Sequence, residues 1–131
     1  MVSTGEKVSS SLLAIALDSI GVKAKSLSAS QISMKTTNSH SKARILDIDS
    51  SKIIQTIEEG YVPIITGFQG VTEHGDVTTL GRGGSDTTAV AVAANLKAKR
   101  CDIYTDVDGI YTTDPRVVPE AKKLDSITME E

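Results

Sequence analysis

A glycine-rich turn leads directly into a helical segment at residues 80–89, which read LGRGGSDTTA. Its glycines carry no Cβ, so backbone N–H groups can close on a ligand, and a helix start adds unpaired N–H groups and a positive dipole end. Arg82 adds a planar fork that suits a carboxylate or a phosphate. The turn therefore predicts an anion-binding site at a junction between strand and helix.

Two common phosphate loops do not match this turn. No Lys-Ser or Lys-Thr pair follows the glycines, as it would in a Walker loop, and the third glycine of a dinucleotide fingerprint would fall on Asp86. The remaining alternative is a tight turn with an exposed arginine. We favour anion binding because the glycines, the arginine and the helix start coincide.

The composition is that of one mildly acidic globular domain. The chain has 131 residues, a net charge of −3, one Phe, three Tyr and no Trp, so its core depends on aliphatic side chains. The lack of a basic run argues against nucleic acid, and no bilayer-length apolar stretch or signal peptide points to a membrane. The single cysteine, Cys101, favours a reducing cytoplasm. We expect it to be a small buried residue, with a catalytic thiol as the lesser alternative.

Hydrophobic periodicity and turn residues divide the chain into alternating helices and strands. Helices are predicted over 3–20, 51–59 and 85–97, strands over 22–27, 44–48, 61–67 and 100–105, hairpins over 70–80 and around 110–112, a loop over 28–42, and a short strand with a helix start over 124–131. This order implies parallel strands with right-handed crossovers and helices on both faces. Ligands collect beyond the carboxyl ends of such strands, so we expect residues 81–86 and 105–116 on one edge of the sheet.

Residues 105–116, TDVDGIYTTDPR, form the second polar cluster. They could be only a turn and a hairpin, because Asp-Gly and Asp-Pro are ordinary turn formers. They also bring hydroxyls, carboxylates, an aromatic ring and an arginine together after a strand. Those groups suit a nucleotide, with Tyr111 for base packing and Arg116 for phosphate.

The whole sequence resembles the aspartokinases, a branch of the amino-acid kinase superfamily. The matching segments are STGE at 3–6, FQGVT at 68–72, TTLGRGGSDTTA at 78–89, YTDVDGIYTTDPR at 104–116 and KKLDSIT at 122–128. The resemblance implies a three-layer α/β/α sandwich with a mainly parallel sheet, the amino-acid kinase (carbamate kinase-like) fold, here incomplete. It implies transfer of phosphate from ATP to L-aspartate, giving ADP and 4-phospho-L-aspartate, the first step towards lysine, threonine and methionine.

The resemblance also implies roles for individual residues. Glu6 would hold the substrate ammonium group, although by itself it is also an ordinary acid in a first helical turn. Arg82 would bind the α-carboxylate, and Asp86 would be the catalytic residue that orients the charged groups around the phosphoryl group. Gly83, Gly84 and Ser85 would supply neighbouring polar contacts to the substrate. The implied ATP-binding residues are Ser85, Thr105, Asp106, Tyr111, Thr112, Thr113, Asp114, Pro115 and Arg116. Mg²⁺ would arrive on the ATP phosphates, with no metal ligand from the protein.

Two features of family members are not present in this sequence, namely an N-terminal Lys-Phe-Gly-Gly segment and C-terminal ACT regulatory domains. We therefore expect residues 1–131 to be a central or C-terminal part of the kinase catalytic domain, inactive alone and associated as a homodimer or higher oligomer. The alternatives are a non-catalytic nucleotide-binding or self-associating fragment, and a kinase for another amino acid. His40 and His74 lie in polar segments and are expected to be solvated.

Overall fold

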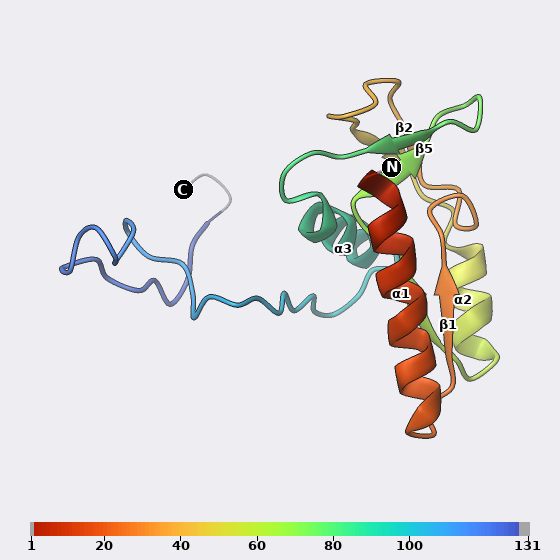
Figure 1. Cartoon of the computed structure of the whole chain (residues 1–131), viewed down its shortest axis with the longest axis horizontal. Helices are drawn as coiled ribbons and strands as arrows, with labels where there is room; N and C mark the ends of the chain where they lie inside the picture. Colours follow the sequence, from red (N-terminus) through yellow and green to blue (C-terminus); the bar gives the residue numbers. More distant parts are fainter. Residues whose placement is uncertain (1, 129–131) are drawn as a thin grey trace.

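The computed structural model describes residues 2–128 (Figure 1). Within these residues the elements follow the order α1 (Val2–Ser19), β1 (Ala24–Leu27), β2 (Lys35–Thr36), β3 (Ile45–Asp47), α2 (Ser51–Glu58), β4 (Val62–Ile65), β5 (Gln69–Val71), β6 (Val77–Thr79) and α3 (Gly84–Asn95). These elements form the body of the molecule, and the chain after α3 extends away from it. The three helices predicted over 3–20, 51–59 and 85–97 are confirmed to within two residues at each end.

The described strands form two small sheets. β1 and β4 pair in parallel, with Ala24 opposite Val62 and Leu27 opposite Ile65. In Figure 1, α1 and α2 lie on opposite sides of β1, as the crossover argument predicts. The second sheet has the order β3-β2-β5-β6, in which β2 and β5 are parallel and the outer pairs are antiparallel. The β5–β6 pair confirms the hairpin predicted over residues 70–80.

The three helices end in the same way, with a residue of positive φ just past the last turn. Gly21 and Gly60 have φ of 82°, and Lys97 takes this position after α3 with φ of 52°. The following backbone N–H reaches back five residues in each case, from Val22 to Leu17, Tyr61 to Thr56 and Ala98 to Ala93. This is the Schellman arrangement, which satisfies the last carbonyl groups of a helix.

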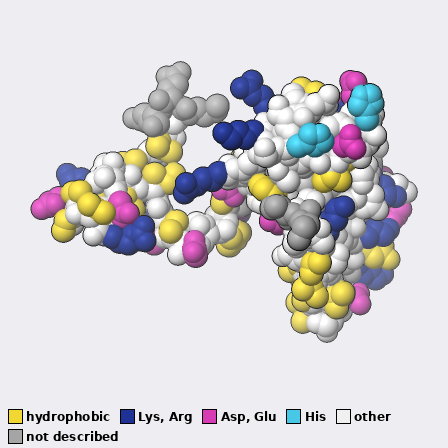
Figure 2. Space-filling model, turned by 45° about the horizontal axis from the view of Figure 1, so that its top comes forward, with side chains coloured by type: hydrophobic (Ala, Val, Ile, Leu, Met, Phe, Trp, Pro, Cys, Tyr) yellow, Lys and Arg dark blue, Asp and Glu magenta, His cyan; other side chains and the backbone are white. Residues whose placement is uncertain are grey.

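The first half of α1 turns polar side chains inward, and the second half turns Ala14 and Leu17 partly inward. Ser3, Glu6 and Ser10 share one face at helical spacing, and each is partly or fully buried. Val8 and Leu12, on the opposite face, are 52% and 60% exposed. Figure 2 shows hydrophobic side chains gathered at the lower end of the body, the end at which the second half of α1 lies in Figure 1. Burial of apolar surface therefore does not explain which face the first half of α1 turns inward.

The core lies where β1, α2 and the segment after β1 meet. Leu27, Ile32, Met34, Ile48 and Ile53 are buried together. The loop expected over 28–42 is thus wrong in part, because it supplies core side chains and contains β2. A compact turn places them: the Ser28 backbone N–H donates to Gln31 Oε1 at 2.8 Å, and the Met34 N–H donates to the Ala29 carbonyl at 2.9 Å.

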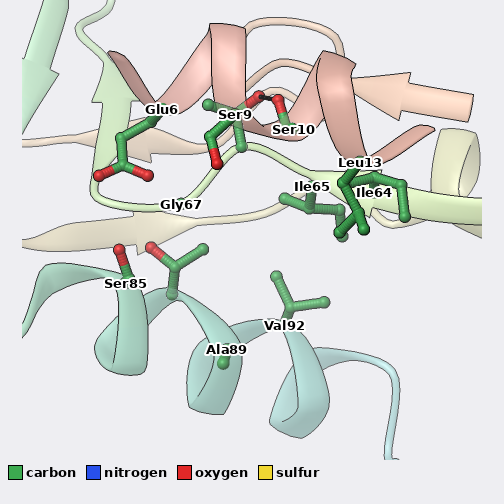
Figure 3. Close-up of a pocket in the computed structure, with 12 residues that line it drawn as sticks. Glu6, Ser9, Ser10, Leu13, Ile64, Ile65, Gly67, Ser85, Ala89 and Val92 are labelled. Carbon is green, nitrogen blue, oxygen red and sulfur yellow. Dashed lines mark hydrogen bonds between the residues drawn. The ribbon is translucent and has the colours of Figure 1, made fainter. Parts of the chain in front are cut away.

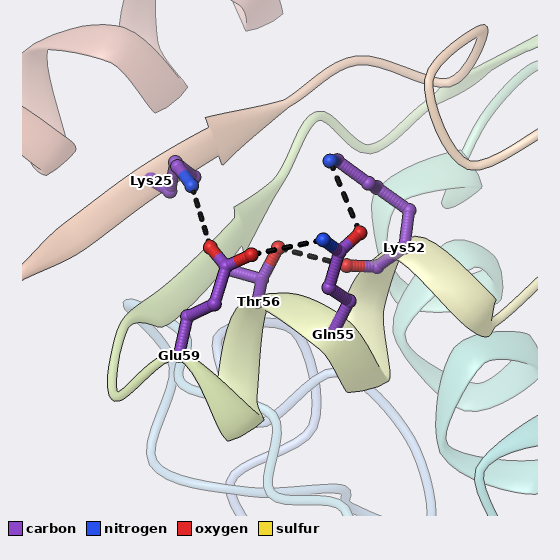
Figure 4. Close-up of polar contacts among 5 residues, drawn as sticks. All are labelled: Lys25, Lys52, Gln55, Thr56 and Glu59. Carbon is purple, nitrogen blue, oxygen red and sulfur yellow. Dashed lines mark hydrogen bonds and ion pairs between the residues drawn. The ribbon is translucent and has the colours of Figure 1, made fainter.

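A polar chain on the outer surface joins β1 to α2 (Figure 4). Lys25 Nζ lies 3.0 Å from Glu59 Oε2 and 4.6 Å from the centre of the Tyr61 ring. Gln55 Nε2 donates to Glu59 Oε1 at 2.9 Å. The hydrogen bond and charge of Lys25 hold the pKa of Glu59 below its usual value. These groups tie α2 to the parallel pair that it covers.

The chain after α3 differs most from expectation. Residues 100–105 do not form the expected strand, Tyr104 is 95% exposed, and Cys101 is exposed, so its expected burial is also wrong. Near the expected small hairpin, Tyr111 instead pairs with Lys123, and residues 124–128 are irregular. The helix start expected after them falls partly on residues 129–131, outside the described residues. A strand is stable only when it pairs with a neighbouring strand. Residues 100–105 do not pair with β4, so one edge of β4 has no partner among the described residues.

Candidate functional site

A cleft of about 350 Å³ lies between α1 and α3, over the carboxyl end of β4 (Figure 3). One end of the cleft is polar and the other is apolar (Figure 3). The polar lining residues are Glu6, Ser9, Ser10, Thr66, Gly67, Ser85 and Thr88, and the apolar ones are Leu13, Ile64, Ile65, Ala89 and Val92.

Glu6 reaches into the polar end from α1. In Figure 3 its carboxylate points towards Gly67 and Ser85, on the opposite side of the cleft. The ion pairs among residues 2–128 are Lys25–Glu59, Arg100–Asp102 and Arg116–Asp114, and none involves Glu6. An ionised carboxylate accepts hydrogen bonds only, so this group suits an ammonium ligand.

The glycine-rich turn brings the first turn of α3 against the end of β4. Gly83 caps α3 with φ of 71°, a left-handed conformation that glycine adopts without strain. A Cβ on Gly84 would lie 2.8 Å from Phe68 Cδ2, and one on Gly67 would lie 3.3 Å from the Cα of Ser85. The glycines at these positions therefore allow the close approach that places Ser85 in the cleft.

Thr88 fixes this junction through its hydroxyl group. Thr88 Oγ1 donates to the Gly84 carbonyl at 2.8 Å and accepts from the Phe68 backbone N–H at 3.1 Å. Phe68 itself has φ of 68°, which is unusual for a residue with a side chain. The turn after β4 and the start of α3 thus form one unit, held by a residue that sequence reasoning did not select.

The expected substrate residues do not all line the cleft. The structure brings Glu6 and Ser85 together, with Gly83 and Gly84 in the adjoining helix cap. Arg82 and Asp86 are exposed beside that cap and do not line the cleft. The structure therefore shows where these two residues lie but assigns them no contact with the cleft.

A second hollow lies within the segment after α3, where most of the expected ATP-binding residues are found. Its lining residues are Asp106, Val107, Asp108, Gly109, Tyr111, Thr113, Asp114, Pro115 and Arg116. Thr105 and Thr112 are not among them: Thr105 Oγ1 lies 3.4 Å from Asp106 Oδ1, and Thr112 Oγ1 accepts from the Lys122 backbone N–H at 3.1 Å.

Hydrogen bonds within this segment occupy several of these groups. Tyr111 Oη donates to Asp108 Oδ2 at 2.7 Å, which raises the pKa of Tyr111 and lowers that of Asp108. Arg116 binds Asp114 through two bonds, Nε to Oδ1 at 3.1 Å and Nη2 to Oδ2 at 3.0 Å, and this lowers the pKa of Asp114. The fork of Arg116 already has an acceptor here.

The cleft and the second hollow share no lining residue, and the segment that carries the hollow extends away from the body (Figure 1), so the expectation of one shared edge is wrong for this structure. That expectation depended on residues 100–105 forming a strand beside the others. Without the strand, the chain leaves α3 and carries the second polar cluster away from the body.

The histidines, possible metal ligands and helix lengths of the described residues bear on which kinds of site are present. His40 and His74 are exposed, as expected, and Figure 2 shows them on the surface. Within residues 2–128, no group of three or more His, Cys, Asp or Glu side chains is placed to hold a metal ion. Nor is any helix in this part of the chain both long and apolar enough to span a membrane.

Sequence reasoning missed several cleft residues, chiefly Ser9, Ser10, Thr66 and Gly67. A signal existed for the last two, because Thr66 and Gly67 end the apolar run of β4, where ligands of parallel sheets gather. The serines on α1 carried no such signal, since a serine in a helix is ordinarily a solvated residue.

Comparisons with known proteins show the family and the fold of this chain. The profile of the Amino acid kinase family matches residues 1–131. An aspartate kinase of Pseudomonas putida is 60% identical over the whole of this chain, which spans 32% of that relative's length. The structure is similar to aspartokinase III of E. coli in complex with aspartate and ADP, with a TM-score of 0.85 and 40% identity over 95% of this chain and 28% of that one. An isopentenyl phosphate kinase is also similar, with a TM-score of 0.70 and 29% identity over 90% of this chain and 45% of that one.

Proposed function

The chain belongs to the amino acid kinase family, and on that basis we propose that it forms part of an aspartate kinase. Such an enzyme transfers the γ-phosphoryl group of ATP to the side-chain carboxylate of L-aspartate. Among the curated relatives, the Pseudomonas putida aspartate kinase supports this substrate, and the E. coli complex with aspartate and ADP supports the pair of ligands. The reaction is the first step towards lysine, threonine and methionine, and we expect it in the cytoplasm.

The observation that carries the proposal is the meeting of Glu6, from α1, and Ser85, from α3, on opposite sides of one cleft. In the proposed complex, Glu6 binds the ammonium group of aspartate. The N–H groups at the start of α3 face the carboxylates, where the helix dipole favours negative charge. Arg82, beside the same helix start, binds the α-carboxylate, and Asp86 orients the charged groups around the phosphoryl group.

In this phosphoryl transfer, the main task of the protein is to position charged groups. A side-chain carboxylate oxygen of aspartate forms a bond to the γ-phosphorus of ATP, the bond from that phosphorus to its bridging oxygen breaks, and ADP leaves with the electron pair. Phosphoryl transfer of this kind needs alignment and charge neutralisation rather than a covalent nucleophile. Mg²⁺, held by the ATP phosphates and water, would supply part of that neutralisation.

Transfer also requires the nucleotide to reach the cleft. We assign the nucleotide to Ser85 and the segment 105–116, which lies away from the body in this structure. Pairing of residues 100–105 with the unpaired edge of β4 would bring this segment to the cleft. Without this pairing, the aspartate part and the nucleotide part of the proposed site stay apart. For that reason we expect the 131-residue chain alone to turn over negligibly.

Calorimetric titration of the 131-residue chain with three acids tests the substrate assignment. We expect L-aspartate to bind more tightly than L-glutamate or N-acetyl-L-glutamate. L-Glutamate is longer by one methylene group, and N-acetyl-L-glutamate has no ammonium group. The replacement Glu6→Gln should weaken L-aspartate binding, whereas Glu73→Gln, an exposed acid outside the cleft, should not. Equal affinity for the three acids would contradict the proposal.

A second candidate is a self-associating fragment without catalysis. The free edge of β4 and the exposed apolar face of α1 favour it, because both surfaces invite a second copy. The two candidates differ in ligand binding: the fragment would associate without any preference for L-aspartate.

A further inference from the structure

A buried polar set joins the first half of α1 to the strands beneath it. Gln69, Ser10 and Thr66 are 1%, 7% and 2% exposed. Gln69 Nε2, on β5, donates to the Ser3 carbonyl at 3.0 Å, and Ser10 Oγ lies 3.0 Å from Thr66 Oγ1 at the end of β4. Buried polar groups are costly unless they are paired, so these contacts hold α1 in one position.

The hydroxyl group of Ser10 uses its full hydrogen-bonding capacity. It contacts the Lys7 carbonyl at 3.1 Å, Ser26 Oγ at 3.2 Å and Thr66 Oγ1 at 3.0 Å. A carbonyl only accepts, so the single Ser10 proton goes to Lys7, and Ser26 and Thr66 must each donate to a lone pair of Ser10. Loss of the hydroxyl group of Ser26 or Thr66 would leave a buried lone pair of Ser10 without a donor. The network therefore favours one position of α1 over others.

These contacts lie on either side of Glu6. Ser3, Glu6 and Ser10 share one face of α1, with Ser3 one turn before Glu6 and Ser10 one turn after it. Large apolar side chains do not hold the first half of α1 in this orientation, since Val8, Leu12 and Ile15 on the opposite face are 52%, 60% and 66% exposed. Rolling α1 about its axis would carry Glu6 out of the cleft.

We infer that Ser10, Thr66 and Gln69 are positioning residues that keep the Glu6 carboxylate directed into the cleft. Gln69 lies outside the cleft lining and acts on a ligand through Glu6, whereas Ser10 and Thr66 also line the cleft. The inference rests on the proposed function, in which Glu6 binds the ammonium group of L-aspartate. It adds the reason why a helix with an apolar outer face presents its acid to the site.

The test compares L-aspartate with succinate, which lacks only the ammonium group. The measured quantity is the ratio of the two dissociation constants on the 131-residue chain, obtained by calorimetry. Glu6→Gln should reduce the preference for L-aspartate by about tenfold or more, the scale of one charged hydrogen bond. Gln69→Leu, Ser10→Ala and Thr66→Val should each reduce it by about threefold or more, because a misplaced carboxylate loses most of its contact. If these residues only stabilised the fold, the replacements would weaken the binding of both ligands equally and leave the ratio unchanged.

Two further variants serve as controls. Thr66→Ser keeps the hydroxyl group and should retain the preference, even if Thr66→Val folds poorly. Thr78→Val removes an equally buried hydroxyl, paired with Thr36 in the other sheet, and should lower thermal stability without changing the ratio.

The outcomes separate the inference from the proposed function. Loss of preference in Glu6→Gln with an unchanged ratio in Gln69→Leu, Ser10→Ala and Thr66→Val overturns the inference alone. Absence of any preference in the unmodified chain, or its persistence in Glu6→Gln, overturns the ammonium role of Glu6 and the inference with it.

Discussion

Single residues decide whether the cleft exists. Gly67 and Gly84 let the end of β4 and the start of α3 approach each other, and Thr88 holds the two together. Without this contact, Ser85 would not face Glu6. The glycine-rich turn therefore acts first through packing, and its proposed ligand contacts depend on that packing.

A matched pair of glycine replacements tests this packing role. Gly84→Ala should destabilise the fold by about 1–3 kcal/mol, because its Cβ meets Phe68 and Leu80 in a filled space. Gly5→Ala should stabilise it by about 0.5–1 kcal/mol, since Gly5 lies inside α1. Its Cβ would meet nothing within 4 Å. Urea denaturation measures both changes. Equal effects of the two replacements would contradict the packing argument.

Arg82 can be tested for its proposed role separately from the cleft. Arg82→Ala should weaken L-aspartate binding by about 1.5–3 kcal/mol, the cost of losing a charged hydrogen-bond partner, and should affect ATP binding far less. Arg44→Ala, an exposed arginine on the neighbouring edge of the body, is the matched control. Calorimetry gives both affinities. An unchanged affinity for L-aspartate would remove Arg82 from the substrate site.

At the scale of elements, contacts between helices and strands hold the body together, and one of them depends on pH. Lys25 on β1 pairs with Glu59 at the end of α2, which keeps the pKa of Glu59 low (Figure 4). A carboxyl group with a lowered folded-state pKa stabilises the fold above its unfolded value, about 4.3 for glutamate. That contribution disappears as the pH falls through the folded-state pKa.

The variant Lys25→Met should therefore lower the melting temperature at neutral pH and show a smaller deficit in acid. The contact of Lys25 with the Tyr61 ring is lost at every pH, so part of the deficit should remain. Lys23→Met, an exposed lysine just before the same strand, should have little effect. A deficit that is constant from neutral to acidic pH would show that the ion pair contributes nothing.

Elements with local signals could be predicted from sequence, and those that depend on distant partners could not. Gly21 and Gly60 mark helix ends because their positive φ is a local requirement. Ala29, Ile32 and Met34 enter the core from a turn, so no period of helix or strand revealed them. The strand over 100–105 was predicted from the local sequence pattern, but a strand is stable only when it pairs, and these residues do not pair with the free edge of β4. For the same reason, motifs identified Glu6 and Ser85 but not Ser10 or Thr66, whose roles come from tertiary contacts.

At the scale of the whole molecule, a compact body carries an extended polar segment (Figure 1). The body leaves one edge of β4 unpaired among the described residues, and exposes Leu12, Ile15 and Ile20 on and just after α1. Free edges and apolar patches favour association with a second copy.

We therefore expect the chain to be a dimer or higher oligomer in solution. Light scattering measures its mass directly. Replacing Leu12 and Ile15 with Glu should shift the protein towards the monomer, whereas replacing the exposed Glu58 with Gln should not. A monomer at all accessible concentrations would contradict this expectation.

The central claim is that Glu6 and Ser85 form one L-aspartate site between α1, β4 and α3. Titration of an isotope-labelled chain with L-aspartate, followed by amide NMR, tests it most directly. The account predicts saturable shifts at Glu6, Gly67 and Ser85, small shifts at the distant α2 residue Gln55, and loss of the response in Glu6→Gln. Saturable shifts confined to residues 106–116, or none at Glu6 and Ser85, would contradict it.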